Sequence, residues 1–141
     1  MAGGKFRAAS DAALANETGA ARWIGLLSTL PTREDGTGMV EVSDANYARQ
    51  AVAANTDWNA VTTAADNLTR QTSINADKSF PAAAALFNVK GWALFDAVSA
   101  GNKRRWGPIV DGSGNPVTGG QDVAAGTTFI LAADTVVISE A

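Results

Sequence analysis

The chain of 141 residues contains no cysteine and no histidine. Without them it can form no disulfide and no zinc finger, and it has no cysteine nucleophile. The Ser-His-Asp triad and most transition-metal sites are also excluded, because both depend on imidazole. A chain without cysteine is compatible with assembly in a reducing cytosol. Since the remaining residues form no catalytic constellation, we expect a protein that is not an enzyme and has no cofactor.

A basic charge excess and long apolar runs are missing too. The formal net charge is −3, which argues against a general nucleic-acid binder, because such proteins carry a net basic face. No apolar run reaches the roughly 18 residues of a membrane-spanning helix. The first residues also lack the apolar core of a signal peptide. We therefore expect neither a nucleic-acid partner nor a membrane.

Apolar residues make up 46% of the chain, which is enough for a folded core. Alanine and glycine are abundant, so the core must come from four tryptophans, five phenylalanines and scattered aliphatic residues. The length suits one domain with a sizeable core. We expect an N-terminal arm with a short helix over residues 1–20 and a single β domain over residues 21–141.

The predicted helix covers residues 8–18, where alanine and leucine favour helix formation. Ser10 and Asp11 are candidate caps at its start, and Gly19 is a candidate stop. A helix this short is marginal on its own, so we expect it to dock on the rest of the domain.

Strand patterns begin at Arg22. Short apolar or alternating runs between Gly, Pro, Asn and Asp residues predict strands at residues 22–29, 39–43, 89–98, 103–110, 128–132 and 135–139. Residues 55–77 favour irregular and strand structure. Residues 79–87 allow one turn of helix, and the proline near their start disfavours a central strand there. The fold class we predict is mainly β, an antiparallel β-sandwich or a small barrel with a short N-terminal α-helix.

The run at residues 89–98 is apolar on both of its faces. Trp92 and Leu94 share one face, and Ala93 and Phe95 share the other. Because a strand of this kind needs cover on both sides, we expect it to be central. The turn at residues 99–102 then returns the chain as the next strand.

Three cations, Lys103, Arg104 and Arg105, stand directly before Trp106. One interpretation is a patch that contacts phosphate or an acidic partner. In a regular strand, however, Arg104 and Trp106 point one way while Lys103 and Arg105 point the other. We expect Trp106 to pack inward, and Lys103 and Arg105 to meet solvent or an acidic protein neighbour.

The stretch from Asp111 to Asp122 has part of the spacing of a calcium loop. Asp111, Ser113 and Asn115 occupy positions 1, 3 and 5, and Asp122 occupies position 12. Position 6 is Pro116, where the sharp turn needs glycine, and no helix is predicted on either side. We favour a hairpin loop, with a calcium site as the alternative.

Other carboxylates raise the question of acid–base chemistry. Asp96 precedes the turn at residues 99–102, so we expect it to accept hydrogen bonds from turn amides. Glu34 and Asp35 lie in a glycine-rich loop. None of them has a sequence partner that indicates catalysis.

The four tryptophans are predicted anchors of the core or of interfaces. Trp58 lies between Asp57 and Asn59, so we expect it to lie nearest a surface. Tyr47 and Arg49 share one face of an alternating segment. The predicted interface residues are Trp58, Tyr47, Arg49, Lys103 and Arg105.

A series of short motifs follows a fixed order between residues 20 and 138. They are Trp23–Leu26, Glu41–Ser43, Tyr47–Arg49, Phe80–Pro81, Gly91–Ala97, Gly101–Asn102, Gly107–Pro108 and Val123–Phe129. In this order they resemble a family of small tailed-bacteriophage virion proteins, often labelled tail fibre or structural proteins. The chain departs from the family pattern at residues 103–105, where apolar residues are usual, and in a longer insertion at residues 111–120.

The resemblance implies a non-enzymatic structural protein of a phage virion, assembled in the cytoplasm of the bacterial host. One compact domain is not itself a long fibre, so we expect a multi-copy module that decorates the capsid or is seated on the tail. Its partners would be other virion proteins and copies of itself. The apolar-leaning ends, residues 1–9 and 136–141, suit such docking. The alternative is a host-receptor or glycan-binding module, in which exposed Trp or Tyr residues would lie in loops.

Overall fold

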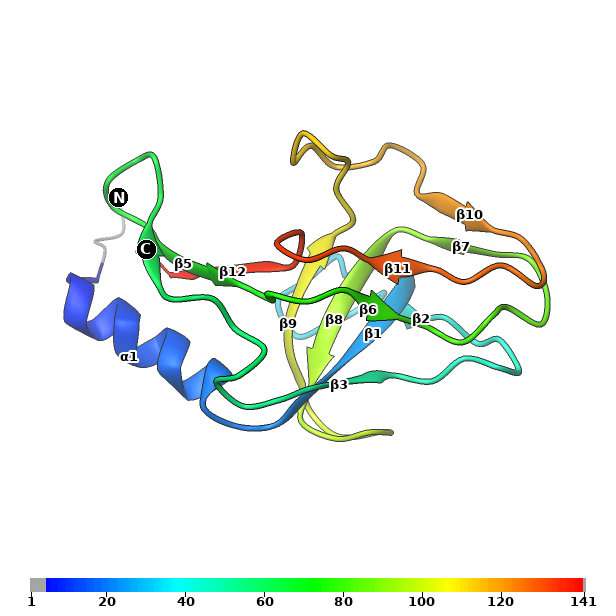
Figure 1. The fold of residues 1–141 in the computed structure, drawn as a ribbon, viewed down its shortest axis with the longest axis horizontal. Helices are drawn as coiled ribbons and strands as arrows, with labels where there is room; N and C mark the ends of the chain where they lie inside the picture. Colours follow the sequence, from blue (N-terminus) through cyan, green and yellow to red (C-terminus); the bar gives the residue numbers. More distant parts are fainter. Residues whose placement is uncertain (1–4, 141) are drawn as a thin grey trace.

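The computed structural model describes residues 5–140, which form one helix and twelve short strands (Figure 1). The elements are α1 (Arg7–Thr18), β1 (Arg22–Thr29), β2 (Val40–Glu41), β3 (Gln50–Val52), β4 (Thr62–Thr63), β5 (Arg70–Ser73), β6 (Lys78–Ser79), β7 (Phe87–Val89), β8 (Gly91–Phe95), β9 (Lys103–Pro108), β10 (Gln121–Val123), β11 (Ile130–Leu131) and β12 (Val137–Glu140). The predicted mainly β class with a short N-terminal helix is confirmed.

Helix α1 begins one residue before the predicted start and ends where the sequence predicted. Gly19 closes it and donates its amide to the carbonyl of Ala15. The predicted caps were wrong, because Ser10 and Asp11 lie inside the helix and the N-cap is Phe6, which forms no side-chain cap. The helix packs against β5 and β12 and buries Leu14 there (Figure 1). This docking stabilises a helix too short to persist alone.

Five strands form the principal sheet, in which β8 is central as predicted. Strand β1 pairs with one edge of β8 and β9 with the other, both antiparallel. On its far side β1 pairs with β2 near its end and with β3 near its start. Among the described residues β9 has no second partner, so it is an edge strand.

Three smaller antiparallel sheets complete the fold. Their strand orders are β10-β7, β11-β6 and β12-β5-β4. The two strands predicted near the C-terminus exist as β11 and β12, but they pair with β6 and β5 rather than with each other. Residues 55–77 are strand and irregular structure as predicted, and residues 79–87 hold no helical turn.

The core lies on both sides of β8, as its sequence predicts. Trp92 and Leu94 belong to the large core, which the principal sheet shares with the smaller sheets, so we call their side the inner face. Ala93 and Phe95 belong to a second, small cluster with Leu27, and we call their side the outer face. The fold is thus a sandwich in which the outer face of the principal sheet has only partial cover.

No helix within residues 5–140 has the length and apolar character needed to span a membrane.

Candidate interaction surface

The three cations before Trp106 are arranged by a β-bulge in β9. Lys103 lies opposite Phe95, but Arg105 lies opposite Leu94, so Arg104 is an extra residue that breaks the alternation. Residues directly opposite each other share a face. Lys103 therefore lies on the outer face, Arg105 lies on the inner face, and Trp106, opposite Ala93, returns to the outer face.

The predicted pairing of side chains along β9 was therefore wrong. Arg104 and Arg105 act together instead of pointing apart: both donate to the carboxylate of Glu17, with Nε–O distances of 2.9 and 3.4 Å. Lys103 and Trp106, predicted on opposite sides, share the outer face. The predicted inward packing of Trp106 was also wrong, because 47% of this residue is exposed.

Glu17 is the centre of a buried ionic cluster that sequence reasoning missed. Its side chain is 7% exposed and also accepts a hydrogen bond from Arg22 at 3.2 Å. Burial alone raises the pKa of the Glu17 carboxyl. The hydrogen bond from Arg104 and the surrounding guanidinium charges outweigh burial, so the pKa lies below its ordinary 4.5. The sequence signal for this cluster was Glu17 itself, a charged residue on the side of an alanine-rich helix that docks on the domain.

The predicted interface residue Arg105 continues this cluster. Its guanidinium also binds Glu140 of β12 at 2.6 Å. The Glu140 carboxylate pairs in addition with Lys5, which precedes α1. The hydrogen bond from Lys5 and then that from Arg105 keep the pKa of Glu140 below its ordinary range, although burial opposes them. Arg105 thus joins β9 to β12 inside the chain.

Tyr47 and Arg49 are likewise held by contacts within the chain. The Tyr47 hydroxyl donates to Glu41 and accepts the amide of Leu26, in the gap that β2 and β3 leave along β1. Burial first, and then the bond to Glu41, raise the pKa of Tyr47. Arg49 binds both Glu41 oxygens, at 2.9 and 2.8 Å. Its guanidinium carbon lies 3.4 Å from the centre of the Phe95 ring.

Trp58 does not lie near the surface. It is 7% exposed and belongs to the large core, so the predicted placement was wrong. Its neighbours in sequence misled the prediction, because Asp57 turns away to bind Lys78 and the amide of Ala53. The tryptophan that is exposed to solvent is Trp106, which lies on the outer face together with Lys103.

Beside Trp106 the outer face is hollowed to about 230 Å³. Ala93 lies beneath the hollow, Trp106 and Lys103 come from β9, and Met39 and the loop at residues 34–36 stand opposite. A Cβ built on Gly36 would lie 2.9 Å from Cδ of Lys103, so this side chain crosses close over the loop. Arg104 and Arg105 line it too, so the hollow combines an aromatic ring, three cationic residues and two carboxylates.

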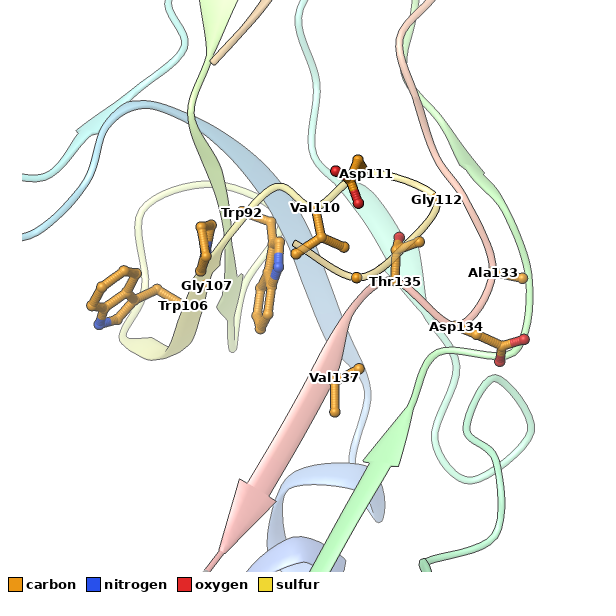
Figure 2. A pocket seen from close by; sticks show the side chains of 12 residues that line it. Trp92, Trp106, Gly107, Val110, Asp111, Gly112, Ala133, Asp134, Thr135 and Val137 are labelled. Atoms are coloured by element: carbon orange, nitrogen blue, oxygen red, sulfur yellow. The ribbon is translucent and has the colours of Figure 1, made fainter. Parts of the chain in front are cut away.

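A larger hollow, of about 610 Å³, opens where β9 approaches β12 (Figure 2). The indole of Trp92 lines it and lies close on β9, where a Cβ on Gly107 would come within 2.6 Å of the ring. Trp106 borders this hollow, but its ring projects away from Trp92 and Val137 (Figure 2).

The polar groups of this larger hollow are held by neighbouring loops. Asp134 accepts hydrogen bonds from Asn59 and Ser73, and the hydroxyl of Thr135 donates to the carbonyl of Ala132. Asp111 accepts the amides of two residues of its own loop, as described below. The larger hollow therefore has fewer free polar groups than its size suggests.

The residues with calcium-loop spacing form a hairpin loop, the favoured interpretation. The loop closes through a bridge between Val110 and Pro116. Asp111 accepts the amides of Ser113 and Asn115 at 2.8 and 3.1 Å. Asp122 instead lies on β10 and accepts the side-chain amide of Asn88 at 2.9 Å. Within residues 5–140 no three acidic side chains gather where they could hold a metal ion.

The other carboxylates singled out from the sequence support turns. Asp96 accepts the amide and the side-chain amide of Asn102, at 2.7 and 2.8 Å, as predicted. These two bonds lower the pKa of Asp96, the backbone bond most. Asp35 accepts the amide and hydroxyl of Thr37, and the hydroxyl bond is the largest cause of its lowered pKa.

A third hollow, of about 360 Å³, is lined by residues from the start of α1 and from the turn between β4 and β5, and three of them are the cations Lys5, Arg7 and Arg70. Phe6 and Leu68 line it and are 91% and 77% exposed, more than any other large apolar side chain in residues 5–140. Exposed apolar side chains that gather in this way indicate a contact with another molecule.

The comparisons with known proteins place this fold in a family. No curated protein matches the chain. A family model described as "Podophage GP4 fiber I protein gp80" matches residues 10–138, from within α1 to β12. The predicted resemblance to phage tail-fibre and structural proteins is confirmed. Because the match spans nearly the whole fold, the chain belongs to the podophage GP4 fiber I protein gp80 family.

Proposed function

We propose that this chain is a multi-copy, non-enzymatic subunit of a phage tail fibre that docks onto neighbouring virion proteins. Family membership makes it a phage tail-associated structural protein of the virion. We favour the tail over the capsid because the family is one of fibre proteins. Assembly would take place in the host cytoplasm, because a chain without cysteine needs no oxidising compartment for disulfide formation.

A non-enzymatic role is supported by the use of the carboxylates. Asp35, Asp96 and Asp111 each hold amides of their own turn, so each has a structural task. The most buried carboxylate, Glu17, is neutralised by guanidinium groups and is closed off from a substrate.

The single observation that supports docking is the exposure of Phe6 and Leu68. Both side chains are mostly in solvent although α1 and β5 beside them are packed. Apolar side chains flanking one hollow are the usual anchors of a protein–protein contact. Many copies in one particle would turn a modest contact into stable attachment through avidity.

The test substitutes Phe6→Ser and Leu68→Ser together and counts the chains in purified particles by quantitative mass spectrometry. We expect the isolated variant to melt like the wild type, because neither residue belongs to the core, and its copy number per particle to fall severalfold. The matched control is Leu86→Ser, which changes another exposed leucine, 67% in solvent, that does not line this hollow. Equal incorporation of the double variant and the wild type would refute the docking role.

The alternative function, host-ligand binding, is favoured by a different observation. Trp106 is exposed beside a hollow that also carries charged side chains. The exposure of Trp106 is what we expected of a ligand site, although the residue lies on strand β9 and not in a loop.

A further inference from the structure

The ring of Trp106 is exposed on the outer face of the principal sheet. It projects from an edge strand onto the outer face, opposite the small residue Ala93. Trp58 and Trp92 belong to the large core. Trp23 and Trp106 belong to neither core cluster, and of these two only Trp106 is exposed. An unburied aromatic ring of this size at the edge of a hollow indicates a ligand.

The hollow beside Trp106 has both hydrogen-bond donors and hydrogen-bond acceptors. Lys103 forms no ion pair within residues 5–140, so its ammonium group is free to donate. Asp35 lends one carboxylate oxygen to Thr37 and keeps the other, and its lowered pKa keeps the group charged at neutral pH. Glu34 adds a second carboxylate at the rim.

We propose that this hollow binds one neutral pyranose ring of a saccharide. One side of a pyranose carries C–H groups of partial positive charge, which suit the electron-rich face of an indole. Its hydroxyls both donate and accept hydrogen bonds, so they match the carboxylates of Glu34 and Asp35 and the ammonium of Lys103. A hollow of about 230 Å³ suits a single ring rather than a long chain segment.

Charge and area argue against the other classes of ligand. Glu34 and Asp35 repel phosphate. Arg104 and Arg105 also line the hollow, but their guanidinium groups are bound to Glu17. A nucleic acid therefore finds one free cation and two anions here. A protein interface needs a far larger apolar area than one indole ring provides.

The proposal rests on the alternative function, host-ligand binding, which concerns this same hollow, and it does not depend on the contact at Phe6 and Leu68. The two are tested separately: incorporation into particles reports the docking role, and binding of small saccharides by the isolated chain reports this site.

The experiment titrates ¹⁵N-labelled chain with methyl glycosides and follows the amide and indole signals by NMR. The probes are the methyl glycosides of glucose, galactose, mannose, rhamnose and N-acetylglucosamine, each up to about 50 mM because one ring binds weakly. We expect at least one probe to shift the Trp106 indole signal and the backbone amides of Lys103 and Asp35 along one saturable curve.

Two variants and one control make the test decisive. Trp106→Ala should weaken binding at least about tenfold, and Glu34→Gln should weaken it severalfold, while both keep the melting temperature of the wild type. Phe6→Ala, another exposed aromatic residue outside the hollow, should bind like the wild type. Absence of saturable shifts with every probe would overturn the proposal, as would shifts that persist in Trp106→Ala. Shifts that follow protein concentration instead of saccharide would also overturn it and identify a contact between copies of the chain.

Discussion

At the scale of single residues, Glu17 is the carboxylate with the most ion-pair partners within residues 5–140. One buried carboxylate on α1 receives guanidinium groups from β1 and from both arginines at the bulge of β9. A buried charge without partners is costly, but here the guanidinium charges and the Glu17 carboxylate neutralise each other. The cluster joins the N-terminal helix to the principal sheet, which explains how a helix without a side-chain cap stays in place.

We expect Glu17→Gln to lower the free energy of unfolding by roughly 3 kcal/mol at neutral pH, because Arg22 and Arg104 lose their ion-pair partner and Arg105 keeps only Glu140. Urea unfolding followed by tryptophan fluorescence measures the change. The control is Asp11→Asn, on the same helix. Asp11 pairs with Arg70 and is more exposed than Glu17, so its loss of stability should be much smaller. A loss no larger than that of the control would contradict the assignment of Glu17.

The same carboxylate predicts how acid affects stability. The pKa of Glu17 is lowered by folding, so the unfolded chain binds its proton first as the pH falls. This contribution to stability is complete above the ordinary pKa of 4.5 and is lost as the pH falls through the lower folded value. The wild-type unfolding free energy should therefore fall more steeply below pH 4.5 than that of Glu17→Gln. Parallel curves for the two proteins would exclude this role.

Gly25 shows how one missing side chain makes room for a polar network. A Cβ at this position would lie 2.6 Å from the Tyr47 hydroxyl and 2.7 Å from a carboxylate oxygen of Glu41. We expect Gly25→Ala to cost about 1–3 kcal/mol of stability, because the network must shift or break. Gly112→Ala is the matched control, since a Cβ there meets nothing within 4 Å. Denaturant midpoints compare the two, and similar midpoints would be evidence against the tight fit.

At the scale of elements, the bulge in β9 decides which side chains meet. It places Arg104 and Arg105 on Glu17 and leaves Lys103 with Trp106 on the outer face. Edge strands often carry bulges, charges and proline, which hinder pairing with other chains. Strand β9 has all three, with Pro108 at its end, so we do not expect it to recruit a further strand.

We expect Arg104→Ala and Arg105→Ala each to lower the unfolding free energy by on the order of 1–2 kcal/mol, because both donors serve one buried carboxylate. The double variant should lose less than the sum, since the two arginines share Glu17. Lys103→Ala should leave stability almost unchanged. Thermal melts of the four variants provide the comparison. If Lys103→Ala were as unstable as Arg104→Ala, the bulge would not lie at Arg104.

Much of the element pattern follows from local sequence. The bounds of β1, the turn between β8 and β9 and the two apolar faces of β8 were predictable, because each depends on a run of neighbouring residues. The bulge was not, since a period of two assumes that no residue is extra. The exposure of Trp58 and Trp106 and the partners of β11 and β12 depend on contacts distant in sequence, which local patterns do not encode.

At the scale of the whole molecule, the chain has two surfaces with different chemistry. The hollow at the start of α1 is lined by the exposed apolar residues Phe6 and Leu68 together with the cations Lys5, Arg7 and Arg70. The hollow at Trp106 joins the indole ring and the apolar residues Pro31, Met39 and Ala93 with charges of both signs. A fibre subunit that docks through the first surface would leave the second free for a ligand.

The measurement that tests the central claim most directly is electron cryomicroscopy of intact particles at a resolution that shows side chains. The account predicts copies of the chain in the tail, with Phe6 and Leu68 buried against a neighbouring subunit and Trp106 accessible. Density for the chain on the capsid, or Phe6 and Leu68 exposed to solvent in every copy, would contradict it.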